Sequence, residues 1–424
     1  MSLRKPAFAL FAVILAVSVF APSLFSQLRF RPYEERAAWD KRSTYVKFIE
    51  SEGIPIYKGY FANAKTVKLK PWKRLGVDGA YLYLDGNGDI ADLWVSEIRP
   101  GNKSLPERHL FEEHIFVLSG EGETRVWQAK KNSSKTVGHW RKGSWFAIPV
   151  NAWHEHVNTG TTPVRMVAVT TAPVIMDIFH NRDFVFNTDY DFTDRFDGKP
   201  LYYDPENAQH YPRNRGKHAL TITNMERDAY RAPLFFGAQG EGETNRSYIL
   251  AGDAMGAHIE EMEPGTYQRA HRHGPAAVIV LLYGTGYSLL WPPSAGLQPF
   301  AQGNGEQVKR VDWDEGVVFV PPLQWYHQHF PSGKTSGRYL HMGGRMGNEH
   351  FPVAGGELSQ SETYMVQYRE EDPKILQIFE AELKKNGADL RMPPRAELIK
   401  TEEESARVFG GSWIHEGDLP KKDK

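Results

Sequence analysis

Short apolar runs separated by glycine-rich turns recur along the middle of the chain. Two of them, at residues 114–118 (HIFVL) and 278–282 (VIVLL), each follow a Pro-Gly turn and a polar stretch, and each precede a Gly-x-Gly turn. Apolar runs of this length, bounded by turn residues, are typical of strands buried in a sheet. The pattern therefore predicts strand–turn–strand units in both halves of the chain.

The two halves also repeat each other at fixed spacing. Residues 88–127 align without a gap with residues 252–291 at an offset of 164, and residues 143–160 align with residues 316–333 at an offset of 173. Identical pairs include Gly88/Gly252, Asp89/Asp253, Glu97/Glu261, Pro100/Pro264, Gly101/Gly265, His109/His273, Gly120/Gly284, Gly122/Gly286, Trp127/Trp291, Gly143/Gly316, Pro149/Pro322, His154/His327 and His156/His329. The loop between the blocks is nine residues longer in the second copy. Two matching blocks in the same order indicate an internal duplication.

Segments outside the repeat show other patterns. Residues 176–245 are rich in Asp, Asn, Tyr and Arg with little periodicity, and we expect a long linker that packs on the repeated domains. Near the C-terminus, Asp372 and Pro373 precede a helical apolar pattern, and Gly387 follows it. Asp at the N-cap, Pro at the first turn and Gly at the stop predict a short helix. Its apolar stripe consists of Ile375, Ile378, Phe379 and Leu383.

The first residues differ from the rest of the chain. A short basic start precedes residues 7–25, which are apolar apart from two serines and one proline. This predicts a signal peptide or a membrane anchor within residues 1–26, and hence an exported protein, either periplasmic or secreted. The small-residue cleavage pattern is poor, so cleavage and retention as an anchor both stay open.

Composition narrows the classes of partner. The chain has 424 residues, a formal net charge of −1, 12 % aromatic residues, 38 Gly and 27 Pro. The near-zero charge argues against a nucleic acid as a partner, and the glycines and prolines suit many strands joined by tight turns. The sequence contains no cysteine, which excludes disulfides and thiolate metal sites.

The first copy offers a set of metal ligands. Side chains two or six residues apart on a strand share one face, which groups Glu107, His109 and Glu113. A later strand offers His154 and His156. A small barrel brings such inner faces together, so two strands can deliver several nitrogen and oxygen donors to one point. These donors suit Fe(II), Mn, Ni, Cu or Zn, and we predict a divalent metal site.

The second copy differs from the first at the ligands. It has His271 and His273, Ala277 at the position of Glu113, and His327 and His329 on the later strand. Three histidines without a carboxylate therefore form its predicted metal site. Other polar residues near the motifs are assigned to supporting, structural or surface roles: Arg108, His114, His156, His258 and His329.

At these motifs the chain resembles the cupin superfamily, whose first motif contains HxH, Glu and Gly and whose second contains Gly, Pro, His and Asn. The first copy has Glu107 where the first His is expected, and the second has Ala277 in place of Glu. Its matching residues are His109, Glu113, Gly120, Gly143, Pro149, His154 and Asn158 in the first copy, and His271, His273, Gly284, Gly316, Pro322 and His327 in the second.

The resemblance implies an all-β fold: two cupin domains in tandem, each a jelly-roll β-barrel, with a short C-terminal helix. We expect an N-terminal extension at 27–75, cupin domains at 76–175 and 246–345, the linker at 176–245, and a C-terminal extension at 346–424.

The three-His set and the run HRHGPAAVIVLLYGTG are also similar to gentisate-type ring-cleaving dioxygenases, which are bicupins with a three-His iron. This resemblance implies a metal-dependent oxygenase, with Fe(II) as the metal, O2 as co-substrate and a small aromatic or enolic substrate. Glu113 would be a ligand, and Glu107 a fourth ligand or a general base. Two alternatives stay open: a non-redox isomerase or decarboxylase that uses Mn or Zn, and a non-catalytic binding or storage bicupin. Association into a homo-oligomer is also open.

Overall fold

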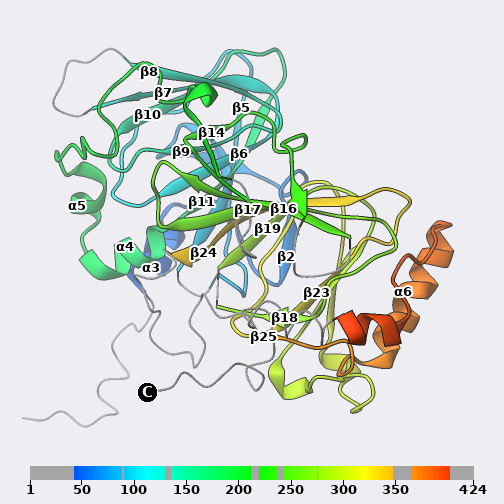
Figure 1. The fold of residues 1–424 in the computed structure, drawn as a ribbon. Coiled ribbons are helices and arrows are strands. Elements are labelled where there is room, and N and C mark those ends of the chain that lie inside the picture. Colours follow the sequence, from blue (N-terminus) through cyan, green and yellow to red (C-terminus); the bar gives the residue numbers. More distant parts are fainter. Residues whose placement is uncertain are drawn as a thin grey trace, which may run out of the picture. The chain divides into compact units, whose positions relative to one another are not determined.

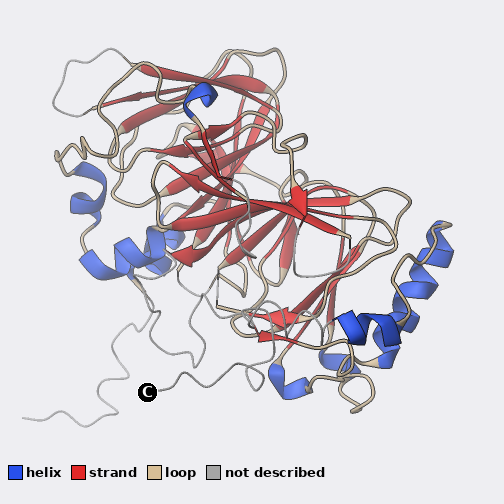
Figure 2. Cartoon of the chain, in the orientation of Figure 1, coloured by secondary structure: helices blue, strands red, loops and turns tan. Residues whose placement is uncertain are grey.

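The computed structural model describes residues 43–87, 90–128, 135–211, 219–236, 242–274, 276–346 and 364–401. The predicted signal peptide or anchor lies outside these residues, as do Gly88 and Asp89 of the repeat. Within the described ranges, no helix is both long enough and apolar enough to span a bilayer. Strands dominate the fold (Figures 1 and 2).

The first domain consists of two sheets packed against each other. Its strands are β1 (Ile56–Tyr57), β3 (Lys70–Trp72), β4 (Val77–Leu82), β5 (Asp92–Ile98), β6 (Glu113–Ser119), β7 (Glu121–Trp127), β8 (Thr136–Arg141), β9 (Trp145–Ile148), β10 (Trp153–Asn158), β11 (Val164–Thr170) and β14 (Met225–Glu226). The large sheet has the order β1-β4-β5-β11-β6-β9-β14, with β3 paired to β4, and the small sheet has the order β10-β7-β8. Apolar side chains from both sheets fill the space between them.

The second domain repeats this plan. Its strands are β2 (Phe61–Asn63), β12 (Gln209–Tyr211), β13 (Leu220–Thr223), β15 (Phe235–Phe236), β16 (Glu243–Leu250), β17 (Met255–Met262), β18 (His271–Arg272), β19 (Ala277–Tyr283), β20 (Tyr287–Trp291), β21 (Lys309–Asp312), β22 (Val317–Phe319), β23 (Tyr326–Phe330), β24 (Gly337–Met346) and β25 (Tyr364–Met365). The large sheet has the order β12-β13-β16-β17-β24-β19-β22-β2, with β15 paired to β16, and the small sheet has the order β21-β20-β23-β18-β25.

Equivalent strands pair in the same register. His154 pairs with Val126 between β10 and β7, and its counterpart His327 pairs with Leu290 between β23 and β20. The offsets of 173 and 164 seen in the sequence therefore persist in three dimensions. The predicted duplication and all-β jelly-roll fold are confirmed, and each domain is a sandwich of two sheets.

The second glycine of each Gly-x-Gly turn lies under a tryptophan ring. A Cβ at Gly122 would lie 2.4 Å from the ring of Trp140, and a Cβ at Gly286 would lie 2.5 Å from the ring of Trp313. These separations are far below van der Waals contact, so only glycine fits at either position.

The two domains share one apolar core between their large sheets. Val95 and Val167 of the first domain belong to the same buried cluster as Ile259, Val280 and Leu340 of the second. Burial of apolar surface contributes roughly 25 cal/mol per Å2, which makes this shared core a major source of stability.

Edge strands are exchanged between the domains. β2, which precedes the first domain, pairs with β22 of the second, where Phe61 lies opposite Phe319. β14, from the segment between the domains, pairs with β9 of the first, where Met225 lies opposite Phe146. The predicted linker thus contributes strands to both domains. Strands of two to four residues are too short to show an alternation of apolar and polar residues in the sequence, so the sequence did not predict them.

Within the described ranges, the helices α3 (Thr44–Ser51), α4 (Ala172–Phe179), α5 (Arg182–Asn187) and α6 (Pro373–Asn386) border the sheets. The predicted C-terminal helix is confirmed as α6, whose N-cap Asp372 accepts from the Lys374 amide at 2.9 Å. Gly387 ends it with a left-handed φ of 65°. The stripe of α6 packs on Tyr326 and Phe330 of β23. The three earlier helices were not predicted, because helices of six to eight residues are too short to show a clear helical period in the sequence.

Candidate metal centres

The first-domain cluster consists of Glu107, His109, Glu113 and His154. Its ligand atoms converge: Glu113 Oε2 lies 3.1 Å from His109 Nε2 and 3.7 Å from His154 Nε2, and Glu107 Oε1 lies 3.8 Å from His154 Nε2. One ligand atom each from Glu107, His109 and His154 lie within 4.8 Å of one another. The structure therefore brings together all four residues that the sequence proposed for this copy.

The ligands of this cluster come from both sheets. Glu107 forms only an isolated bridge with His154 of β10, beside the small sheet, whereas Glu113 opens β6 of the large sheet. Residues 108–112 between them are not strand. The expectation that Glu107, His109 and Glu113 share one face of a single strand is thus corrected: the chain crosses between the sheets at this point.

The second-domain cluster consists of His271, His273 and His327, with one ring nitrogen from each within 4.8 Å of the others. The ring centroids of His271 and His327 are 4.2 Å apart, and those of His273 and His327 are 4.7 Å apart. Burial, with a smaller contribution from His273, lowers the pKa of His271 to about 3. Burial, followed by His271 and His273, also holds the pKa of His327 well below its usual value. The imidazoles of His271 and His327 are therefore neutral near pH 7, and each has a lone pair that can bind a metal.

All five histidines of the two clusters are oriented by backbone carbonyls. Each has Nδ1 within hydrogen-bond distance of a carbonyl oxygen: His109 with Phe111 at 2.9 Å, His154 with Ala152 at 3.2 Å, His271 with Arg269 at 3.2 Å, His273 with Gly274 at 2.9 Å and His327 with Trp325 at 3.2 Å. A carbonyl oxygen only accepts, so we assign the hydrogen to Nδ1 and the lone pair to Nε2. Fixing the tautomer in this way is typical of metal-binding histidines, and the residues of both clusters fit a divalent metal.

Arg74, in the turn between β3 and β4, pairs with Glu107. Its guanidinium also donates to Glu52 at 2.7 Å. Burial raises the pKa of Glu107, but Arg74 and then His154 lower it more, to about 2. Such a carboxylate is ionised and weakly basic, which suits a metal ligand better than the general base that the sequence left open. No sequence signal pointed to Arg74.

Glu113 and His154 support each other's charged states. Burial raises the pKa of Glu113, but the nearby rings of His109 and His154 lower it overall. Burial lowers the pKa of His154, but the nearby carboxylates of Glu107 and Glu113 raise it overall. The first-domain cluster thus contains two carboxylates whose pKa values are lowered, whereas the second-domain cluster contains histidines and no carboxylate.

His156 and His329 lie beside the two clusters and are held by hydrogen bonds to neighbouring side chains. His156 Nδ1 lies 2.8 Å from Thr124 Oγ1, which accepts from Trp140 Nε1 at 2.8 Å. We assign the hydroxyl hydrogen to the bond with Nδ1, so the lone pair of His156 is already used. The second domain repeats this arrangement at 2.9 Å for both bonds, with Trp313, Ser288 and His329. The supporting role expected for both histidines agrees with these contacts.

A pocket of about 500 Å3 opens beside the first-domain cluster. We call it the Arg108 pocket; it is lined by Arg74, Pro106, Glu107, Arg108, Trp153, Arg182, Asp183, Phe186 and Asn187. Glu107 belongs both to this pocket and to the cluster, and its side chain is 11 % exposed. His109, Glu113 and His154 are buried behind it.

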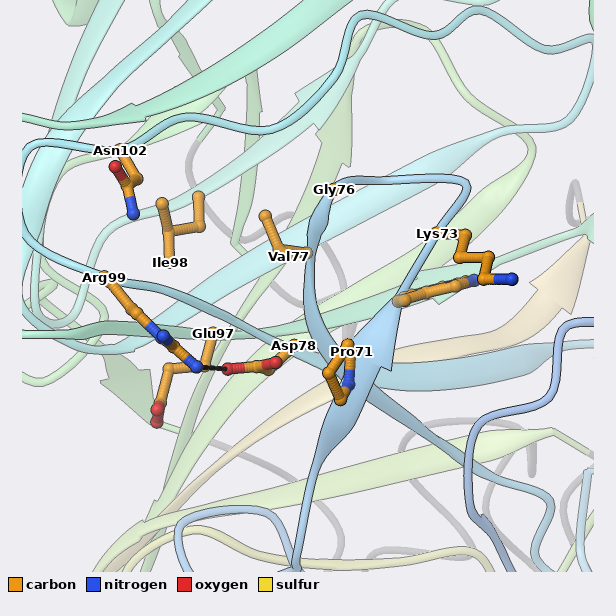
Figure 3. Close-up of a pocket in the computed structure, with 10 residues that line it drawn as sticks. Pro71, Lys73, Gly76, Val77, Asp78, Glu97, Ile98, Arg99 and Asn102 are labelled. Carbon is orange, nitrogen blue, oxygen red and sulfur yellow. Dashed lines mark hydrogen bonds and ion pairs between the residues drawn. The ribbon is translucent and has the colours of Figure 1, made fainter.

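Figure 3 shows a second pocket, of about 390 Å3, against β3, β4 and β5. Its most prominent polar contact is the ion pair between Arg99 and Asp78 at 3.1 Å. No residue of either metal cluster lines it, so it is separate from the chemistry considered above.

Below the second-domain cluster, the interior of the second domain is polar. The second-domain polar group consists of His258, Glu260, Gln268, Tyr339 and His341. Gln268 Nε2 donates to Glu260, Tyr339 also hydrogen-bonds to Glu260, and the rings of His258 and His341 stack at 4.3 Å. Burial, followed by the charge of Glu243, raises the pKa of Glu260 well above its usual value.

Comparison with known proteins identifies one family. Residues 94–170, from β5 to β11, match the model of the cupin domain. No curated protein sequence matches the chain.

Among solved structures, three similar folds have low identity to this chain. Oxalate decarboxylase from Bacillus subtilis at pH 4.6 is 10 % identical over 68 % of this chain and 76 % of that one, with a TM-score of 0.43. The Lactobacillus farciminis oxalate decarboxylase formate complex is 10 % identical over 76 % and 95 %, with a TM-score of 0.44. Momordica charantia 7S globulin is 14 % identical over 67 % and 83 %, with a TM-score of 0.39.

Proposed function

Because the chain belongs to the cupin superfamily and carries the fold twice, with a ligand cluster in each copy, we propose that it is a metal-dependent enzyme. The proposed reaction is the oxygenation of a small aromatic or enolic compound by O2, with Fe(II) at the first-domain cluster. One observation carries the choice of this cluster: the Arg108 pocket opens at Glu107, so a small molecule from solvent can approach the ligands there.

His109, His154 and Glu113 would hold the metal, with Glu107 as a fourth donor. A bound Fe(II) ion supplies redox chemistry with O2 and Lewis acidity. The protein's own part is to orient and shield. Backbone carbonyls fix the histidine tautomers, Arg74 holds the Glu107 carboxylate, and the ring of Phe111 stacks on His109 at 3.7 Å and limits access of water.

A non-redox decarboxylase or isomerase is the second candidate. The first-domain cluster contains two carboxylates, and oxygen donors suit Mn as well as iron. In this case the metal would act only as a Lewis acid, and turnover would not require O2.

The test combines metal analysis with oxygen consumption. Purified protein is assayed for bound metal and, in an oxygen electrode, with catecholic, gentisate-like and flavonol substrates. The proposal expects iron and consumption of O2 that His154→Ala abolishes, with the exposed His139→Ala as control. Protein that holds Mn or Zn and turns over without oxygen would establish the second candidate. Protein with no turnover at all, in which the cluster variants lower only stability, would indicate a binding or storage bicupin.

We also propose that the protein is exported, on the basis of the apolar residues 7–25. Fractionation of cells that express the full chain tests this. Recovery from the cytosol of a chain with an intact N-terminus would contradict it.

A further inference from the structure

Arg108 has a buried guanidinium without an acidic partner. The residue is 8 % exposed, and its Nη2 donates to the backbone carbonyl of Asn187 at 2.7 Å. Its Cζ lies 4.9 Å from the centre of the Trp153 ring, and its Nε has no hydrogen-bond partner. A guanidinium offers five N–H donors, and only one bond is made here within the described ranges. A buried charge left in this state is costly unless a ligand completes it.

The other cations of the Arg108 pocket are already neutralised. Arg74 pairs with Glu52 and Glu107, and Arg182 pairs with Glu52 at 2.8 Å. Asp183 accepts from the Asn187 side chain at 2.7 Å and forms no ion pair with Arg108. Among the residues that the structure describes, Arg108 is therefore the cation of this pocket whose charge has no counterpart.

The equivalent arginine of the second domain is satisfied differently. Arg272 stacks on Tyr326 at 5.6 Å, as Arg108 does on Trp153, and donates to Gln324 Oε1 at 2.6 Å. In the first domain, Asn151 occupies the position of Gln324, and both have a left-handed φ. Its side chain instead donates to the carbonyls of Thr188 and Tyr190, at 3.1 and 2.7 Å. The Asn151 amide is therefore hydrogen-bonded to the segment that follows the first domain and not to Arg108. Arg108 lines a pocket instead.

We propose that the Arg108 pocket binds a small organic anion whose carboxylate is received by Arg108 and whose apolar body packs against Trp153 and Phe186. A guanidinium fork matches a carboxylate in shape and charge, and an indole and a phenyl ring suit a flat apolar body. The opposite end of the ligand then faces Glu107 of the first-domain cluster. The inference rests on the proposed function in one respect, that this anion is the substrate of the cluster.

Direct binding tests the inference without turnover. Benzoate is titrated into the full-length, metal-loaded protein by calorimetry, with benzamide as a neutral isostere. We expect benzoate to bind, benzamide to bind at least about tenfold more weakly, and Arg108→Gln to weaken benzoate at least about tenfold. Arg272→Gln, at the equivalent arginine of the second domain, should leave benzoate affinity unchanged. Arg108→Lys keeps the charge but loses the fork, so its affinity should be intermediate.

Two outcomes would overturn the inference: no binding of benzoate to wild type, or equal affinity in Arg108→Gln. If Arg108→Gln does not fold, a crystal structure of wild type with 4-bromobenzoate decides, because the bromine must lie in the Arg108 pocket. The proposed function fails separately. Protein that binds benzoate through Arg108 but neither holds iron nor consumes O2 would retain the anion site and lose the oxygenase.

Discussion

The large sheets of the two domains differ at four equivalent positions that face each domain's own interior. The first domain has apolar or small residues there, and the second has groups that form hydrogen bonds or titrate: Trp94/His258, Ser96/Glu260, Met166/Tyr339 and Ala168/His341. In the first domain, Trp72, Tyr81 and Trp94 pack edge to face, with ring centroids 5.2 to 6.1 Å apart. In the second domain, the Glu260 carboxyl group is hydrogen-bonded to Gln268 and Tyr339.

This difference shows which features the duplication constrains. Strand register and the turn glycines are the same in both copies, because backbone hydrogen bonds and close packing leave no alternative there. Interior side chains are free to diverge as long as each is either apolar or hydrogen-bonded. We therefore expect apolar packing to stabilise the first domain more, and hydrogen bonding the second.

The largest effect should come from the clusters themselves. Replacing His109, Glu113 and His154 by Ala should remove one metal equivalent and all activity. Replacing His271, His273 and His327 by Ala should remove the other equivalent and leave the first in place. The two sets share no residue, so the losses should be independent. Elemental analysis of the purified variants measures this, and loss of both equivalents from one variant would contradict two separate sites.

The next largest difference between the domains should come from truncating interior side chains and comparing the loss of unfolding free energy. Trp94→Ala removes a fully packed ring and should lower the free energy of unfolding by about 3–5 kcal/mol. His258→Ala, at the equivalent position, loses a partly exposed ring that stacks on His341, and about 1 kcal/mol is expected. Urea unfolding followed by circular dichroism gives both values. Equal losses would mean that packing matters as much in the second interior.

Each domain contains a fully buried acid whose pKa is raised. Burial raises the pKa of Asp92 to about 7, against an ordinary value of 3.8, despite a hydrogen bond with Tyr45. Burial raises the pKa of Glu260 in the same direction. A raised folded-state pKa stabilises the fold below the unfolded pKa, and that stability is lost as pH rises through the folded pKa.

As Asp92 titrates, wild type should therefore lose stability between about pH 4 and pH 7, by up to about 1.4 kcal/mol per pH unit. The raised pKa of Glu260 should act in the same direction. Asp92→Asn and Glu260→Gln should each flatten the curve of unfolding free energy against pH. The check is urea unfolding from pH 4 to pH 8. A variant curve parallel to that of wild type would show that the substituted acid does not contribute to the pH dependence of stability.

The smallest effect should come from the ion cluster between the domains. Glu315 of the second domain contacts Lys65 and Lys142 at 2.6 Å each, and accepts from Tyr230 at 2.7 Å. Burial raises the pKa of Glu315, but Lys142, Lys65 and Tyr230 lower it more, to about 2. Its contribution is present above about pH 4.5 and is lost as pH falls toward 2.

Because these side chains are partly exposed, Glu315→Gln should cost less than about 1 kcal/mol at neutral pH and nothing near pH 2. Thermal unfolding at both pH values measures the difference. A loss that is the same at low pH would contradict a role for its charge.

Much of the fold and most cluster members could be predicted from residue spacing. The fixed offsets placed the strands, and strand parity together with the cupin motifs selected the histidines that come together in the two clusters: His109, His154, His271, His273 and His327. Local signals also sufficed for α6, since Asp372 and Gly387 cap it within the same segment.

What could not be predicted depends on distant contacts. The pairing of Arg74 with Glu107 joins a turn to a strand bridge, and neither residue signals the other in the sequence. The sequence assigned Arg108 to a structural or surface role. Its actual surroundings depend on Asn187 and Asn151, which come from other segments of the chain. The polar interior of the second domain was hidden for the same reason, since alternation along one strand does not reveal which polar residues face inward.

The exchanged edge strands have a consequence for synthesis on the ribosome. Phe61 of β2 emerges long before Phe319 of β22, with which it pairs, and β9 of the first domain emerges before β14. Neither sheet is complete until the chain has passed the other domain's border, and pairings so distant in sequence form slowly. A nascent chain that stalls after the first domain exposes an unpaired β2 and an open edge at β9. Dividing the protein between α5 and β12 into two separately expressed halves would leave the first half without β14 and the second half without β2.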